Sequence, residues 1–222
     1  MLNRRSLQVA LLCGALLIGT GVATVLKSPS SVAAPSVSGE SFKQLYMCGS
    51  DGKSICKIGA EGPGGGTIFF VDSSNVYDQF NYLEAAPLNW AGDKGVDPTS
   101  TWCSNTTVAI EKNLTAWSTR AVGRGSSNSR MMLDNCSTGA SALIAQYNSS
   151  AKAKKKDWYL PSLGELIFMT QNLQGLAGLI DSDYWSSSEY SAIGAWVQAV
   201  GHGYQGNATK DTTFHVRPVR SF

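Results

Sequence analysis

The sequence predicts an α+β domain, because strand-like segments lie toward both ends of the chain and helical segments lie between them. Hydrophobic residues make up 43% of the 222 residues, which is enough to form a core. The 23 glycines and the aromatic residues favour a loop-rich fold with short strands over a helical bundle. The 188 residues that follow residue 34 are of a size typical of one domain.

The charge pattern sets the body of the chain apart from its start. All three charged residues among the first 34 are basic, and the remaining 188 residues carry 15 basic and 16 acidic side chains. A nearly neutral body argues against a nucleic-acid partner, since such a protein needs clustered Lys and Arg to neutralise phosphates.

The first residues have the layout of an export signal. An uncharged stretch over 6–26 lies between Arg4/Arg5 and Lys27. We interpret residues 1–33 as a signal peptide, with cleavage before Ala34, or as an N-terminal membrane anchor, because 21 uncharged residues can span a bilayer. The expected location is therefore extracytoplasmic, either secreted or at the cell surface, and only this segment would contact a membrane.

Two further parts follow the leader. Residues 34–42 are rich in Ser, Pro and Ala and are interpreted as a flexible tether. Residues 43–222 form the predicted folded domain.

Four cysteines of this domain are expected to form two disulfides, because an exported chain with an even number of cysteines is typically cross-linked. They are Cys48, Cys56, Cys103 and Cys136. Three pairings are possible, and we favour Cys48 with Cys56 and Cys103 with Cys136, since the first pair closes a short glycine-containing loop. A zinc site is the competing interpretation, but neither pair has zinc-ligand spacing.

The first strands are predicted after a glycine-rich run. Residues 59–66, GAEGPGGG, lead into a strand over 67–72, and 82–87 is its expected partner. The glycine run precedes its strand and has no Lys-Ser/Thr after it, so it does not match a phosphate-binding loop.

Helices are predicted over 126–133 and 140–147, and a third begins just after Pro161. Ser162 and Glu165 form a capping box, a pattern that marks a helix start. Residues 158–160 are expected to be a short extended entry to this helix.

Strands are predicted again over 184–190 and 195–200, followed by a turn through 201–207 and a final β segment over 214–222. We expect the first and last strands of the domain to pair. Arg217 and Arg220 are expected to pair with acidic residues of the body.

Several separated motifs, in this order, resemble the Lcl C-terminal domain family, which is named for the C-terminal domain of a bacterial collagen-like adhesin. They are GPGGGTIFFVD, YLEAAP, DWYLPSLGEL, YWSSSEY, AWVQ and VRPVRSF, over about residues 58 to 222. The resemblance implies a C-type-lectin-like fold, related to the formylglycine-generating-enzyme fold. Such a fold has short twisted antiparallel sheets, flanking helices, and N- and C-terminal strands close together. In relatives of this fold the recognition surface lies between the equivalents of Trp185 and Val216, and the namesake adhesin binds sulfated glycosaminoglycans.

These motifs predict a ligand-recognition, adhesin-like domain that binds a glycan, including a sulfated polysaccharide, or a surface protein. Trp185 and Trp196 are expected in the core. The predicted ligand-binding residues are polar or aromatic and fall at strand ends or in turns, namely Glu189, Tyr190, His202, Tyr204 and Gln205.

A second candidate contact is the lysine cluster of Lys154, Lys155 and Lys156, which would bind anionic polysaccharide in a salt-dependent way. The alternative is an ordinary solvated loop.

No cofactor or metal is predicted. The calcium motifs Glu-Pro-Asn and Trp-Asn-Asp are absent from the sequence, and Asp93/Asp97 or Asp181/Asp183 are better explained as turn formers. No nucleophile-elbow motif surrounds a serine, and the expected disulfides leave no reactive cysteine in the domain, so an enzyme is not expected. The alternatives are a structural or assembly component of the cell envelope and, third, a divergent enzyme.

Overall fold

The computed structural model describes residues 47–49, 52–92, 95–111 and 119–222. The chain divides into two units, Met1–Phe42 and Lys43–Phe222, and the fold described here is that of the second. The expectations for residues 1–33 and 34–42 lie outside the described residues. Within the described part of the chain, no helix combines the length and apolar character needed to cross a membrane.

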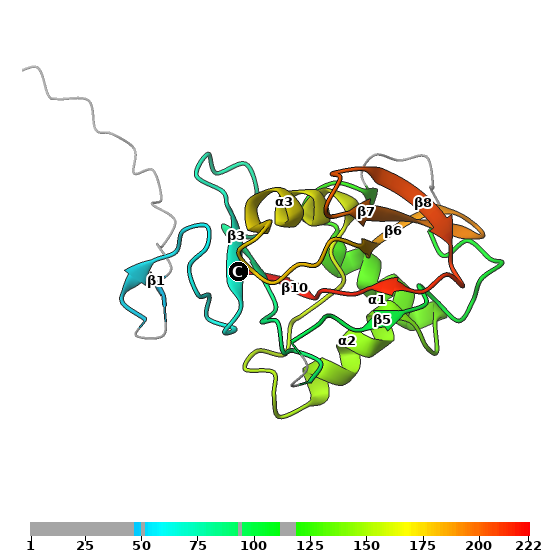
Figure 1. Cartoon of the computed structure of the whole chain (residues 1–222), viewed down its shortest axis with the longest axis horizontal. Coiled ribbons are helices and arrows are strands. Elements are labelled where there is room, and N and C mark those ends of the chain that lie inside the picture. The colour runs from blue at the N-terminus through cyan, green and yellow to red at the C-terminus, as the bar shows by residue number, and fades with distance from the viewer. Residues whose placement is uncertain (1–46, 50–51, 93–94, 112–118) are drawn as a thin grey trace, which may run out of the picture. The chain divides into compact units, whose positions relative to one another are not determined.

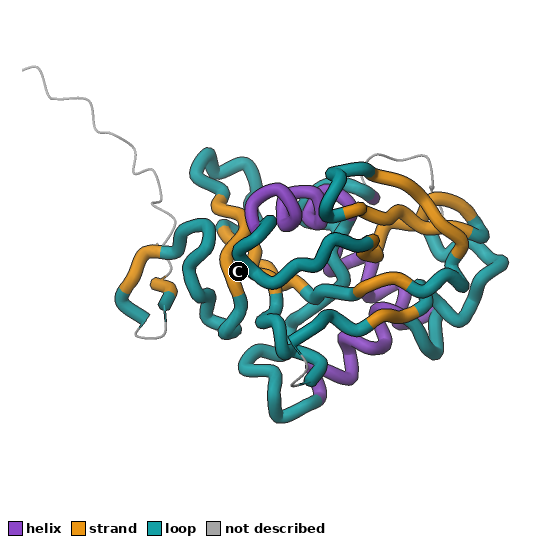
Figure 2. The backbone as a smooth tube through the Cα atoms, viewed as in Figure 1, coloured by secondary structure: helices purple, strands orange, loops and turns teal. Residues whose placement is uncertain are grey.

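The described residues form three helices and ten short strands, with loops between them (Figures 1 and 2). The helices are α1 (Gly125–Asn135), α2 (Ala140–Ser149) and α3 (Leu163–Leu173). The strands before α1 are β1 (Met47–Cys48), β2 (Ser54–Ile55), β3 (Thr67–Val71), β4 (Tyr82–Ala85) and β5 (Thr99–Ser100). Those after α3 are β6 (Asp183–Ser191), β7 (Gly194–Ala199), β8 (Gln205–Thr209), β9 (Phe214–His215) and β10 (Val219–Ser221).

The strands make three small sheets, so the fold is a mixed α/β one with helices in the middle of the chain, as the sequence predicts. The largest sheet has the order β5-β9-β6-β7-β8, the second β10-β4-β3, and the third is the hairpin β1-β2. β3 and β4 pair antiparallel as expected. The last strand, β10, pairs with β4 rather than with β3, so the expected pairing of first and last strands is corrected: β4 lies between them.

The start of α3 confirms the predicted capping box. Ser162 Oγ accepts a hydrogen bond from the Glu165 backbone N–H at 3.3 Å, and the Glu165 carboxylate accepts one from the Ser162 N–H at 2.9 Å. Tyr159, in the predicted extended entry, exchanges backbone hydrogen bonds with Val219. These contacts join α3 to the last strand of the domain.

Two expectations for the last 22 residues are wrong. The turn expected over 201–207 ends early, because Gln205 is already the first residue of β8 and pairs with Gln198 of β7. The segment expected as one strand over 214–222 is divided at Pro218 into β9 and β10, which belong to different sheets. Proline has no backbone N–H to donate, so a continuous ladder through Pro218 is disfavoured.

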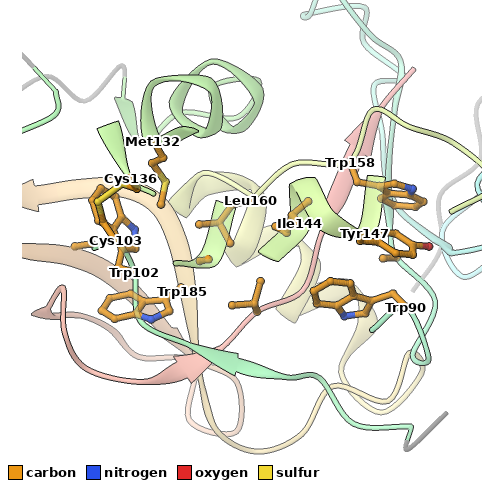
Figure 3. Close-up of a cluster of buried hydrophobic side chains, with 14 of the residues drawn as sticks. Trp90, Trp102, Cys103, Met132, Cys136, Ile144, Tyr147, Trp158, Leu160 and Trp185 are labelled. Atoms are coloured by element: carbon orange, nitrogen blue, oxygen red, sulfur yellow. A yellow bond between two sulfur atoms is a disulfide. The ribbon is translucent and has the colours of Figure 1, made fainter. Parts of the chain in front are cut away.

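The main core cluster collects large aromatic side chains from distant segments (Figure 3). Trp90, Trp102 and Trp185 are each 2% exposed or less, and Trp185 is therefore a core residue as expected. The Cys103–Cys136 disulfide lies in this cluster, and the second disulfide joins Cys48 to Cys56. Both favoured pairings are confirmed.

Both predicted arginine pairings are also present, and both arginines are buried. Arg217 Nε donates to Asp97 Oδ1 at 2.6 Å, and Arg220 donates to Glu84 and to Asp157. Asp97 also accepts hydrogen bonds from Trp90 Nε1 and the Tyr184 hydroxyl, so this carboxylate is a core acceptor.

The glycine run has a structural explanation that the sequence did not provide. The backbone N–H groups of Gly64 and Gly66 donate to the Glu84 carboxylate at 2.7 to 3.0 Å, and Glu84 is fully buried. A Cβ on Gly64 would lie 2.6 Å from the Trp158 ring and 2.9 Å from Glu84 Oε1. The run therefore needs glycine so that its backbone can approach an internal anion.

Candidate functional site

A polar cleft of about 290 Å³ lies between α3 and the turn that joins β7 to β8. Apart from Ile167 of α3, the residues that line it carry amide, hydroxyl or imidazole side chains or belong to the turn. The lining consists of Ile167, Thr170, Gln171, Gln174, Gln198, Val200, Gly201, His202, Gly203 and Gln205. Four of these ten are glutamines, so the wall is dominated by groups that both donate and accept hydrogen bonds.

The glutamines of the β7–β8 pair are held in place by one another. Gln205 Nε2 donates to Gln198 Oε1 at 2.8 Å and to the Gly203 carbonyl at 2.6 Å. Gln198 is 1% exposed, and its Nε2 donates to the Ala199 carbonyl at 3.0 Å. These bonds fix the orientation of both amides. None of them uses the side-chain carbonyl oxygen of Gln205, so this acceptor is held in a fixed position.

His202 stands at the rim of the cleft. Its Nδ1 lies 3.7 Å from Asp181 Oδ1, and the two side chains are 79% and 70% exposed. Because its side chain is this exposed, the imidazole is accessible to a ligand.

Tyr204 is not among the cleft-lining residues, although it is 68% exposed. A Cβ on Gly206 would lie 2.9 Å from Tyr204 Cε1, so the ring rests across Gly206. Side chains alternate between the two faces of a strand, which places Tyr204 on the face of β8 opposite to Gln205.

Tyr190 lies near the β6–β7 turn with a second aromatic residue. Its ring centroid is 5.1 Å from that of Trp196 in an edge-to-face arrangement, and the Arg120 guanidinium carbon lies 4.9 Å from the Trp196 ring centroid. Tyr190 is 45% exposed and Trp196 is half-buried, so Trp196 is less buried than a core position would be.

Glu189 has internal partners. Its carboxylate pairs with Lys210 and accepts hydrogen bonds from the Ile110 and Glu111 backbone N–H groups at 2.7 to 3.0 Å. The side chains of Lys210 and Glu189 are 0% and 2% exposed. A neighbouring cavity of about 10 Å³ has room for roughly one water molecule, which is too little for a sugar.

The three lysines lie in the loop between α2 and α3, apart from the cleft, whose lining contains no lysine. In the view of Figure 1 this loop and β8 are on opposite sides of the drawing. Lys154 Nζ is 3.7 Å from Glu61 Oε1, and Lys156 donates to the Ser150 carbonyl. Arg220, with a smaller contribution from Lys155, lowers the pKa of the Asp157 carboxyl against the opposing effect of burial. Acidic neighbours therefore reduce the positive potential of this loop.

The structure thus separates the residues that the sequence grouped. His202 and Gln205 share the cleft, and Tyr190, Tyr204, Glu189 and the lysines do not. Gln171 and Gln174, which face the cleft from α3, were not predicted. They are exposed positions three apart on a helix and so lie on one face, but only the fold shows that β7 and β8 lie beside them.

Among the described residues, no group of three or more His, Cys, Asp or Glu side chains is arranged to hold a metal ion. The four cysteines of this part of the chain are all disulfide-bonded.

Comparison with known proteins identifies the family. The model of the Lcl C-terminal domain matches residues 87–220, which is more than half of the chain, and the chain belongs to this family. This confirms the resemblance drawn from the sequence motifs. Membership of this family and two disulfides are together typical of an extracellular or surface domain.

One solved structure with a detectable likeness is a fimbrial protein from Bacteroides ovatus ATCC 8483, at 14% sequence identity and a TM-score of 0.48. The alignment covers 81% of this chain and 49% of that protein, so the chain spans about half of its length. No curated protein matches the chain.

Proposed function

We propose that this chain is an exported or cell-surface, adhesin-like recognition domain that binds a glycan in the cleft between α3 and the β7–β8 turn. The observation that carries the proposal is the prearranged Gln198–Gln205 amide pair, with Gln171, Gln174 and His202 around it. Sugar hydroxyls donate and accept hydrogen bonds, and amide side chains offer both functions.

The proposed binding needs neither a cofactor nor a catalytic step. The cleft residues supply hydrogen bonds and shape, and the exposed histidine adds one further donor or acceptor. The family and the arrangement of small sheets beside helices, antiparallel except for the β6–β9 pair, support the C-type-lectin-like fold as part of this proposal. The two disulfides support a location outside the cytoplasm.

A glycan-array screen tests the proposal. The protein lacking residues 1–33, which precede the compact unit Lys43–Phe222, is screened against neutral and sulfated polysaccharides at two salt concentrations. We expect binding that changes little with salt and that Gln205→Ala weakens about fivefold, since one well-oriented hydrogen bond contributes about 1 kcal/mol. The matched control is Gln146→Ala on α2, outside the cleft, which should leave binding unchanged.

The lysine loop defines the competing site. If sulfated polysaccharide is the ligand, binding will fall steeply with salt, and replacing Lys154, Lys155 and Lys156 by Ala will flatten that dependence. Salt-sensitive binding that Gln205→Ala leaves unchanged would indicate that the binding site is this loop rather than the cleft. No binding to any glycan would favour the alternative, a structural or assembly component of the envelope that docks on a protein partner.

A further inference from the structure

The cleft is one end of a longer ledge formed by β7 and β8. Cross-strand partners share a face of the sheet, and the register pairs Gln198 with Gln205 and Trp196 with Asn207. The next pair on this face is Gly194 with Thr209. Gln205, Asn207 and Thr209 are exposed, so the outer strand presents a row of hydrogen-bonding side chains. At about 3.4 Å per residue, the row is about 14 Å long.

Helix α3 packs against β7, the inner strand of this ledge. Its last turns contribute Gln171 and Gln174 to the cleft. At its first turn the Gly164 N–H donates to the Arg120 carbonyl at 2.8 Å, and the Arg120 side chain lies over Trp196. An 11-residue helix is about 16 Å long, which matches the length of the ledge.

The chemistry changes along the ledge. The cleft end offers amides, and the next cross-strand pair offers Trp196, in edge-to-face contact with Tyr190, beside the Asn207 amide. Aromatic rings contact the apolar faces of sugar rings, while amides bind their hydroxyls. None of the five side chains Gln198, Gln205, Trp196, Asn207 and Thr209 carries a charge, although Arg120 and His202 lie at the two ends.

We propose that this ledge binds consecutive units of a linear, neutral oligosaccharide, so that the ligand is a chain rather than a single terminal sugar. This inference rests on the proposed function and specifies the ligand of the same site. One end of the chain occupies the amide cleft, and a unit further along lies against Trp196 and Tyr190.

Titration calorimetry with three named series tests the inference: glucose linked β-1,4, glucose linked α-1,4 and N-acetylglucosamine linked β-1,4, each from the monosaccharide to the octasaccharide. We expect affinity to rise with chain length in at least one series until the ledge is filled. Trp196→Ala should lower affinity for the octasaccharide about tenfold and leave the monosaccharide unaffected.

Asn207→Ala is the second variant, because Asn207 is exposed and we expect the fold to tolerate its replacement. It should lower octasaccharide affinity severalfold, whereas Gln205→Ala should weaken short and long ligands alike. Val76→Ala, at a 69% exposed position in the loop between β3 and β4, is the matched surface control.

The outcomes separate the two proposals. Equal affinity for the monosaccharide and the octasaccharide would refute the proposal that the ledge binds consecutive sugar units, but it would not contradict glycan binding in the cleft. Array binding of other glycans with no binding in any of the three series would overturn the neutral-chain ligand but leave the proposed function. No binding to any glycan would overturn both.

Discussion

Replacing Glu189 by Gln tests whether this carboxylate belongs to the fold or to the binding surface. The substitution keeps the size of the side chain and removes its charge. Lys210 would then be a fully buried ammonium group that has lost its carboxylate partner, although it keeps the Val108 carbonyl as an acceptor at 2.8 Å. The Gln amide would also turn its NH₂ group toward Lys210 or toward a backbone N–H of Ile110 or Glu111, all of which are donors.

The expected cost follows from burial. Breaking a buried ion pair by removing one partner typically costs about 3 to 5 kcal/mol, because the other charge remains in a low-dielectric site. A domain of this size has a free energy of unfolding on the order of 10 kcal/mol. At roughly 2 to 4 °C per kcal/mol, the melting temperature should fall by about 6 to 20 °C.

Urea unfolding followed by tryptophan fluorescence, with thermal melts in parallel, measures this loss. The matched control is Glu61→Gln, which removes the same charge from an exposed pair with Lys154, the two side chains being 43% and 66% exposed. The control should change stability by less than about 1 kcal/mol. A Glu189→Gln protein as stable as the wild type, with weakened glycan binding, would refute the structural role of Glu189 and return it to the ligand site.

Three further predictions concern buried groups. Burial raises the pKa of Glu165 from 4.5 to about 7, so the folded state binds a proton that the unfolded state releases. The contribution of Glu165 to stability should be fully present below about pH 4.5 and should be lost, by about 3 kcal/mol, as the pH rises through 7. Urea-unfolding free energies of the wild type and of Glu165→Gln across this pH range measure the contribution, which the variant should lack. Removing the Cys103–Cys136 disulfide by double substitution with Ser should cost about 3 to 4 kcal/mol by the chain-entropy estimate, and calorimetry showing an unchanged melting temperature would contradict it. Gly64→Ala should destabilise the domain by about 1 to 3 kcal/mol in the same assay, because the added Cβ would clash with Trp158 and Glu84. A variant as stable as the wild type would show that these two side chains can move to make room for it.

Local sequence patterns predicted the elements whose stabilising contacts are close in sequence. The capping box of Ser162 and Glu165 joins residues three apart, and the β3–β4 pair follows the chain order. The Cys48–Cys56 pairing was favoured because its loop is short. The strand at Gln205 was missed since its residues are Gly- and Asn-rich and become a strand only by pairing with β7.

Residue type alone did not show which polar side chains face solvent. Glu189 falls near the end of a predicted strand and was expected at a ligand surface, but the residue that neutralises it, Lys210, is 21 positions away and is also buried. Gln205 and His202 were predicted from their place in a turn. The glutamines opposite them on α3 could not be, because nothing in the sequence shows which helix covers which strand.

The sequence by itself determined the family, the two disulfides, the mixed α/β class and the start of α3, because each depends on residue types at short or recognisable spacings. Only the tertiary structure decided that the glycine run encloses Glu84, that Glu189 pairs with Lys210, and that α3 lies along β7 to make a cleft. These contacts join residues that are at least 18 positions apart in the sequence. The free energy that selects them comes from burying the whole core at once rather than from any local pattern.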